Sequence, residues 1–438
     1  MRSTLVRGNR VVSFAMIALV FWVGSGPAEA QGPPMYDVEE IGPEINGLHP
    51  VDLNNRGEVV GGISGKYLPG ISGYAAFYWF DGVLVDLGAN WEKNLSTAVS
   101  VNDFGVILGT VEGFGDELDR IFEIDPEGNI SYPAPFDPAV DVRAKAINDT
   151  GQIVGTYHPS PNGASIPFFW DRTTPPYDLV PGWADLVFFG GLNNLGQVAG
   201  ASREGLCGNS GFLWEKDSFA GFGTCDEWIA VFDINDAAQI VGSMYFEGFY
   251  QKHAFLFDEP EFVDLGVLSL GEVSVASSIN NRGWIVGDSR SDQPPSRRAF
   301  IYIDGVMYDL NDFVSDDTWH LTRALEINDL GQILMEANLE GGFGTTFLLL
   351  TPSAVDSIEG LIELVGSFEI HHGIEHGLVV KLEHAIEAIA AGDPEGACDL
   401  LQAFVNQVNA QTGKKITDMQ AEELLEAAEQ IRGVLSCP

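Results

Sequence analysis

The chain reads Leu53-Asn54-Asn55-Arg56-Gly57-Glu58-Val59-Val60-Gly61 soon after its start, and this pattern of apolar–Asn–x–x–Gly–x–apolar–apolar–Gly occurs seven times. Its asparagines lie 42 to 48 residues apart, at Asn54, Asn102, Asn148, Asn193, Asn235, Asn280 and Asn328. A recurring period of this length is the signature of a repeat architecture. The nine-residue pattern therefore decides the fold class before any other feature of the chain.

Each repeat carries four short segments with strand-like sequence. The first segment ends at the apolar–Asn pair, and the Asn-x-x-Gly turn leads into a second, such as Gln152-Ile153-Val154-Gly155. An aromatic segment follows, as in Ala76-Phe77-Tyr78-Trp79, and then a segment of the type Val85-Asp86-Leu87-Gly88. Aromatic and β-branched residues between Gly, Asp and Asn turns favour β structure. Four strands in about 45 residues are typical of one β-propeller blade.

The two ends of the repeat region predict a closed ring. The seventh repeat has its hairpin and its aromatic strand, but it runs into Thr351-Pro352 without an Asp-Leu-Gly strand. An orphan strand of that type, Tyr36-Asp37-Val38-Glu39-Glu40-Ile41-Gly42, precedes the first hairpin. We expect it to complete the last blade, because pairing the chain ends removes an exposed sheet edge. The prediction is an all-β, seven-bladed β-propeller, with an open β-solenoid as the alternative.

The repeat resembles the HAF family of extracellular repeats. The likeness covers residues 50–350 and is best at residues 234–266, where the Asn turn precedes His253-Ala254-Phe255-Leu256-Phe257 and Val263-Asp264-Leu265-Gly266. Two copies depart from the pattern, with Ala238 in place of the turn Gly and Met335 in place of the last Gly. The resemblance implies an exported, propeller-like protein without an established activity.

The flanking segments predict export and a second domain. Residues 1–30 have a basic start, an apolar core and an Ala28-Glu29-Ala30 cleavage site, which together predict a signal peptide. We expect a secreted or periplasmic protein cleaved near Ala30, with no membrane span. Residues 31–352 form the predicted propeller, and residues 353–438 show apolar stripes at helical spacing. This last segment resembles the FIMAH helical domain, chiefly at Phe404-Val405-Asn406-Gln407-Val408, which implies an accessory module without catalytic residues.

Charge and cysteine content restrict the partners and the compartment. The formal net charge of −41 argues against nucleic acid and anionic membranes as partners. The expected partner is an extracellular glycan or protein, and we expect a monomer. Export permits disulfides, and their proximity in sequence favours the pairs Cys207–Cys225 and Cys398–Cys437.

Polar residues of the repeats have a structural explanation that competes with a functional one. The seven asparagines could surround a ligand, but we expect each side chain to bond its own turn. The Asn-Asp pairs, as at Asn102-Asp103, could hold calcium, yet they lack the spacing of a calcium loop. We expect no cofactor, with calcium as the alternative. His371, His372, His376 and His384 are grouped, but they specify no complete ligand set, so no metal site is expected.

The function prediction depends on residues outside the repeat register. In-register aromatics are expected to pack the blades, which leaves five candidates for ligand binding: Trp91, Trp183, Trp228, Tyr250 and Trp319. No nucleophile motif is present, so no catalytic residue is predicted, and the expectation is a non-enzymatic exported binding protein. One alternative is an extracellular carbohydrate-active enzyme, a lyase or hydrolase, with its site at the central channel.

Converging His, Tyr, Arg or acidic side chains on one propeller face would favour the enzyme. His158, His253 and His320 would then have to point to that face. A further alternative is a structural component of a matrix or surface layer.

Overall fold

The computed structural model describes residues 32–435 and Cys437, with gaps inside that range. The gaps are residues 43–46, 65–73, 89–94, 114–117, 135, 137–139, 160–164, 174, 180–186, 204–208, 217, 224–227, 246–250, 270, 294, 316–317, 340–343 and 369. The predicted signal peptide lies outside the described residues.

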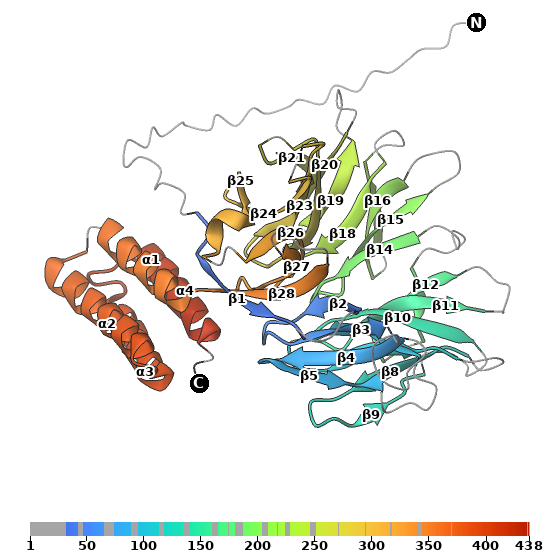
Figure 1. Ribbon diagram of the computed structural model, residues 1–438, viewed down its shortest axis with the longest axis horizontal. Coiled ribbons are helices and arrows are strands. Elements are labelled where there is room, and N and C mark those ends of the chain that lie inside the picture. The colour runs from blue at the N-terminus through green and yellow to red at the C-terminus, as the bar shows by residue number, and fades with distance from the viewer. Residues whose placement is uncertain are drawn as a thin grey trace, which may run out of the picture. The chain divides into compact units, whose positions relative to one another are not determined.

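The described residues of the repeat region form seven antiparallel sheets of four strands, each sheet being one propeller blade (Figure 1). Blade 1 contains β2 (Leu48–Leu53), β3 (Val59–Ser64), β4 (Tyr74–Phe80) and β5 (Val83–Asp86). Blade 2 contains β6 (Ser96–Val101), β7 (Ile107–Val111), β8 (Arg120–Ile124) and β9 (Ile130–Ser131). Blade 3 contains β10 (Asp141–Ile147), β11 (Ile153–His158), β12 (Ile166–Trp170) and β13 (Tyr177–Asp178). Blade 4 contains β14 (Val187–Leu192), β15 (Val198–Arg203), β16 (Asn209–Glu215) and β17 (Ser218–Phe222).

Blades 5 to 7 repeat the same strand order. Blade 5 contains β18 (Ala230–Ile234), β19 (Ile240–Tyr245), β20 (Lys252–Asp258) and β21 (Glu261–Gly266). Blade 6 contains β22 (Val273–Ile279), β23 (Ile285–Arg290), β24 (Arg297–Ile303) and β25 (Val306–Asp309), and the 3-10 helix η2 (Leu310–Phe313) follows. Blade 7 contains β26 (Trp319–Ile327), β27 (Ile333–Leu339), β28 (Thr345–Pro352) and the N-terminal strand β1 (Tyr36–Glu40). The predicted seven-bladed propeller is confirmed.

Strand β1 closes the ring, as the orphan segment predicted. It runs antiparallel to β28, from the pair Tyr36↔Pro352 to the pair Glu40↔Leu348. Beyond this ladder, the Ile41 amide donates to the Phe347 carbonyl at 2.9 Å. Tyr36 and Ile41 are both buried. The N-terminal segment thus supplies the outer strand of the last blade, which excludes the open solenoid.

The aromatic strands pack the blades, as predicted. Their central phenylalanines are fully buried in six blades: Phe77, Phe122, Phe168, Phe212, Phe255 and Phe300. Complete burial of such a side chain contributes about 1.5–3 kcal/mol to folding. The repeated aromatic residue is therefore a core residue and not part of a ligand site.

Every innermost strand contains a β-bulge three residues before its asparagine. In blade 1 the ladder passes from Pro50 to Asp52 and leaves Val51 unpaired, and the other six blades repeat this irregularity. The last Gly of the sequence pattern faces the bulge. A Cβ atom on Gly61 would collide with the carbonyl oxygen of His49 and the ring of Phe77. The nine-residue pattern therefore encodes the bulge as well as the turn.

The C-terminal residues form four helices: α1 (Ala354–Ser367), α2 (His372–Ala390), α3 (Pro394–Gln411) and α4 (Asp418–Val434). The side chain of Asp393 caps α3, and a reciprocal pair between Thr417 and Gln420 caps α4. Leucines of all four helices share one core, and the predicted disulfide joins Cys398 to Cys437 with 5.5 Å between their Cα atoms. Among the described residues, none of the helices has the length and apolar character needed to cross a membrane.

Candidate functional site

The repeated asparagines stabilise their own turns, as predicted. In blade 1, Asn54 Oδ1 accepts hydrogen bonds from the amides of Arg56 and Glu58 at 3.0 and 2.9 Å. Gly57 takes the left-handed conformation of the turn, with a φ of +78°, which glycine adopts without steric strain. Asn54 is itself buried. The asparagine and the first glycine of the pattern are thus explained by turn geometry.

The same asparagines also join neighbouring blades, which the sequence analysis did not predict. Each Nδ2 group donates to the main-chain carbonyl of the next repeat's asparagine, at 2.9–3.2 Å. The bonds run from Asn54 through Asn102, Asn148, Asn193, Asn235, Asn280 and Asn328 and return to Asn54. We call this closed set of hydrogen bonds the asparagine ring.

A second closed ring lies one residue further along each turn. The backbone amide of each residue donates to the side-chain oxygen of its counterpart in the next blade, at 2.6–3.0 Å. We call this second ring the rim. Its members are Asn55, Asp103, Asp149, Asn194, Asp236, Asn281 and Asp329. The carboxylates of the Asn-Asp pairs therefore bond to neighbouring turns. The described residues contain no group of three or more side chains suited to hold a metal ion.

The innermost strands and their turns line an open cavity of about 260 Å³ at this end of the central channel. Because of the bulge, two consecutive residues of one strand line it, such as Val51 with Asp52 and Phe232 with Asp233. Val51 and Phe232 are 41% and 42% exposed. The cavity thus combines apolar side chains with polar ones at adjacent positions.

Two carboxylates in the cavity have matching environments in blades 1 and 5. Asp52 accepts from the amides of Leu53 and Val101, at 3.0 and 2.8 Å. Asp233 accepts from the amides of Ile234 and Ile279, at 2.8 and 2.9 Å, and also from the Ser278 hydroxyl at 2.8 Å. Burial raises the pKa of Asp52 above its ordinary value, and the hydrogen bonds oppose this shift because they favour the ionised form.

A third carboxyl, Glu326 of blade 7, lies in the same cavity with fewer donors. Burial and the nearby charges of Asp233 and Asp52 raise its pKa well above the ordinary value, opposed by the Ser278 hydroxyl and the charge of Lys145. Burial also raises the pKa of Asp233, to about 6, against the effect of its hydrogen bonds. Lys145 is the only basic residue that lines the described cavity. Acidic side chains therefore converge at the channel.

The two ligand candidates within the described residues do not line this cavity. Trp228 is 48% exposed before β18, and Trp319 is partly buried at the start of β26, against the core that blades 6 and 7 share. The other aromatic candidates, Trp91, Trp183 and Tyr250, lie outside the described residues, as does the predicted Cys207–Cys225 bridge.

The histidines that the enzyme alternative required do not line the cavity. His253 is buried on β20, with its Nδ1 3.0 Å from Asp264 on β21. His320 lies on β26 with its Nε2 3.2 Å from the carbonyl oxygen of Arg297. On α2, His372 lies 3.9 Å from Glu375. Of the residue types whose convergence would favour an enzyme, only the acidic ones therefore converge in this cavity.

Sequence reasoning missed Asp52, Asp233 and Glu326, although one signal for them was present. All three stand two residues before the repeated asparagine, where the other copies have Ser100, Ala146, Gly191 and Ser278. Positions that vary between structurally equivalent copies are not required by the fold. A comparison of the copies at this position would have identified the three carboxylates.

Comparisons with known sequences assign the chain to no family. No protein-family model and no curated protein sequence matches the chain, so the HAF and FIMAH resemblances stay predictions. Among solved structures, the chain resembles a virginiamycin B lyase from Staphylococcus aureus, with a TM-score of 0.41, 9% identity, and coverage of 72% of this chain and 99% of that one. A gluconolactonase from Xanthomonas campestris gives a TM-score of 0.36 at 10% identity, covering 75% of this chain and 99% of that one.

A prolyl endopeptidase gives a TM-score of 0.41 at 10% identity. That match covers 57% of this chain and only 40% of the endopeptidase. The prediction of a non-enzymatic protein is contradicted, since these three solved structures are described as enzymes, and at 9–10% identity they assign no activity to this chain. A propeller without a familiar nucleophile motif gives no reason to exclude catalysis.

Proposed function

We propose that the protein is an exported hydrolase that cleaves a glycosidic bond in the channel cavity. The convergence of Asp52, Asp233 and Glu326 is the observation that carries this proposal. A cavity in which carboxyl groups have perturbed pKa values is the first place to seek acid–base chemistry. Export rests on the N-terminal sequence and is compatible with the Cys398–Cys437 disulfide.

The hydrogen bonds divide the roles among the carboxyl groups. Asp233 accepts three hydrogen bonds and is therefore the ionised base at neutral pH. Glu326 has fewer donors and lies beside other carboxylates, so it keeps its proton to higher pH. Carboxyl groups with separated pKa values are the usual acid and base of glycoside hydrolysis.

In the proposed reaction, Glu326 gives its proton to the oxygen of the leaving sugar as the glycosidic C–O bond breaks. A water molecule attacks the sugar carbon and loses its proton to the Asp233 carboxylate. The charge of Asp52 helps to raise the pKa of Glu326. Asp52 also stabilises positive charge on the sugar ring in the transition state. The products are two free sugar hydroxyl groups, and the two carboxyl groups exchange protonation states with solvent to complete the cycle.

The cavity favours a terminal sugar unit as the substrate. Its volume of about 260 Å³ is smaller than the roughly 300–1,000 Å³ of typical ligand pockets. The rim carboxylates and amides line its mouth and can accept hydrogen bonds from sugar hydroxyls. Phe232 and Val51 present apolar surface to a bound sugar ring. We therefore infer cleavage from a chain end.

The test is hydrolysis of a panel of 4-methylumbelliferyl glycosides from pH 4 to pH 9. We expect kcat/KM to fall below about pH 6, where Asp233 takes up a proton, and to fall again at higher pH, where Glu326 loses its own. Glu326→Gln should lower kcat by about 10²–10⁴-fold and abolish the upper limb. Glu261→Gln, at an exposed position of β21, is the matched control. Equal activity of E326Q and wild type, or no hydrolysis of any glycoside, would refute the proposal.

A further inference from the structure

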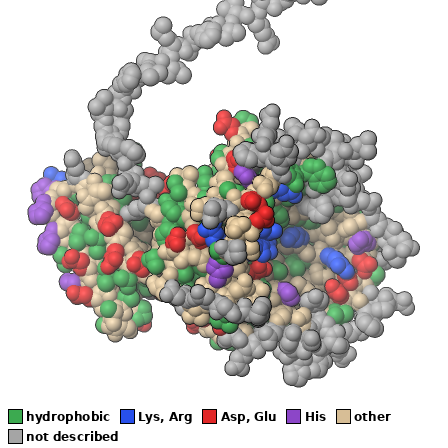
Figure 2. Space-filling view, turned by 45° about the horizontal axis from the view of Figure 1, so that its top comes forward, with side chains coloured by type: hydrophobic (Ala, Val, Ile, Leu, Met, Phe, Trp, Pro, Cys, Tyr) green, Lys and Arg blue, Asp and Glu red, His purple; other side chains and the backbone are tan. Residues whose placement is uncertain are grey.

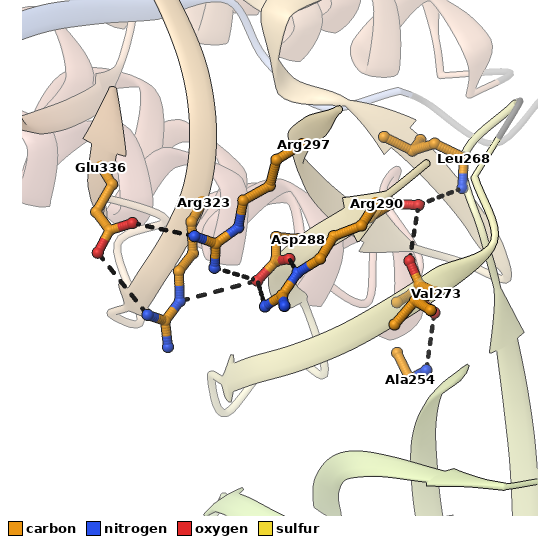
Figure 3. Close-up of polar contacts among 10 residues, drawn as sticks. Ala254, Leu268, Val273, Asp288, Arg290, Arg297, Arg323 and Glu336 are labelled. Atoms are coloured by element: carbon orange, nitrogen blue, oxygen red, sulfur yellow. Dashed lines mark hydrogen bonds and ion pairs between the residues drawn. The ribbon is translucent and has the colours of Figure 1, made fainter. Parts of the chain in front are cut away.

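A cluster of arginines lies at the opposite end of the blades from the Asn turns. Arg290 ends β23 and Arg297 begins β24, so both are at the far end of blade 6. Arg323 is the middle residue of β26 in blade 7, and Figure 3 shows the three guanidinium groups arranged around Asp288. Figure 2 shows Lys and Arg side chains gathered beside acidic ones on the propeller surface. These arginines are separate from the channel cavity described above.

Asp288 holds the arginines together. Its side chain is 1% exposed and accepts from Arg290 Nε at 2.6 Å and from an Arg297 terminal nitrogen at 2.9 Å. Burial alone would raise the pKa of Asp288, but hydrogen bonds from Arg297 and Arg290 lower it below its ordinary value. Asp288 is therefore ionised under all physiological conditions and fixes the positions of two guanidinium groups.

Arg323 is held nearby without a close partner in the cluster. Its ion pairs with Asp288 and Glu336 are both 3.8 Å long, beyond hydrogen-bond distance. The Nε–H groups of Arg323 and Arg297 are buried and have no acceptor among the described residues. A buried donor without an acceptor destabilises the folded chain. Since 35% of the Arg323 side chain is exposed, its guanidinium can still reach a ligand.

The charges of the cluster define the ligand that fits. Three arginines face the two carboxylates Asp288 and Glu336, which leaves one positive charge in excess. The chain as a whole carries a formal net charge of −41, which repels a polyanion. A ligand with a single negative charge satisfies both conditions. The planar fork of a guanidinium matches a carboxylate in shape and can bind it through two hydrogen bonds.

We propose that Arg290, Arg297 and Arg323 form a binding site for the single carboxylate of a small organic acid or sugar acid. Arg323 supplies the principal contact, and Arg290 presents an exposed guanidinium beside it. Asp288 holds the guanidinium groups of Arg290 and Arg297 in place. This site is separate from the hydrolytic site, because none of the three arginines lines the channel cavity, although Arg323 shares strand β26 with Glu326. It adds an acid-recognition function to the propeller.

Isothermal titration calorimetry on the mature protein tests the site with three probes. D-Glucuronate is the sugar acid, lactate is a non-sugar acid, and the methyl ester of glucuronate is the uncharged control. We expect glucuronate to bind and the ester to bind at least tenfold more weakly. If lactate binds as well, the site recognises the carboxylate alone. If glucuronate binds and lactate does not, the ligand is a sugar acid.

Variants locate the binding. Arg323→Gln should weaken glucuronate binding at least tenfold, and Arg323→Lys should weaken it less because the charge remains without the fork. Arg298→Gln is the control, since Arg298 bonds to Asp309 and to the carbonyl of Ser269 outside the cluster. Glu326→Gln should leave binding unchanged, which separates this site from the channel cavity. The proposal fails if no acid binds, if the ester binds equally well, or if R323Q binds like wild type.

Discussion

Replacement of Asn235 by Ala tests whether the asparagine ring stabilises the propeller. Asn235 is buried, and its Oδ1 accepts from the amides of Ala237 and Gln239 at 3.1 and 3.0 Å. Its Nδ2 donates to Gln239 Oε1 at 2.8 Å and to the Asn280 carbonyl at 3.0 Å. The substitution removes all four hydrogen bonds, one of which joins blade 5 to blade 6.

The expected loss follows from these bonds. A buried hydrogen bond contributes about 0.5–1.5 kcal/mol, and an unsatisfied buried group costs about 1–3 kcal/mol. Four bonds at the middle of the first range give a loss of about 4 kcal/mol in the free energy of unfolding. Such a value exceeds the effect of most substitutions, which are centred near 1 kcal/mol.

Urea denaturation followed by tryptophan fluorescence measures the loss in the propeller. All nine tryptophans precede residue 353, and all except Trp22 of the predicted signal peptide lie in the repeat region, so the signal reports this region and not the four helices. Asn129→Ala is the matched control, because Asn129 makes an exposed side-chain bond to Asp125 at 2.9 Å. The control should change stability by less than about 0.5 kcal/mol. A loss for N235A no larger than that of N129A would refute a stabilising role for the ring.

The remaining predictions concern the chain ends. Removing residues 31–45 deletes β1 and should lower the urea midpoint of the repeat region relative to a chain lacking only residues 1–30; equal midpoints would contradict closure by β1. Replacing Cys398 and Cys437 by Ser should cost the helices about 4 kcal/mol, the chain-entropy value for a loop of 39 residues. Circular dichroism at 222 nm measures this loss, and an unchanged midpoint would show that the disulfide does not stabilise the helices.

The fold was predictable because its signals are local and recur. The Asn-x-x-Gly turn, the aromatic strand and the orphan segment Tyr36–Gly42 each lie within a few residues, and the period of the repeat orders them. To close the predicted propeller, only one further inference was needed, that the last blade takes its missing strand from the N-terminus. The structure confirms this pairing from Tyr36 to Glu40.

The candidate site was less predictable because it depends on the bulge. Simple alternation along β18 would turn Phe232 and Asp233 to opposite faces of the sheet. The bulge turns both side chains to the channel. The repeated sequence pattern specifies this bulge through its last glycine, as the close approach of Gly242 to Ala230 in the structure shows. The arginine cluster depends on contacts between residues of different blades, such as Asp288 and Arg323, which one sequence does not pair.

The asparagine ring gives the propeller a direction. Every Asn side chain donates forward to the next repeat and accepts nothing comparable in return, so each repeat has a donor side and an acceptor side. Such an interface is heterologous, like the head-to-tail contact between subunits of a cyclic oligomer. One polypeptide here contains the interfaces that separate subunits would form in a cyclic heptamer. The asparagine ring therefore does not determine between which blades the chain termini lie. Circular permutation at another inter-blade segment would preserve every hydrogen bond of the ring.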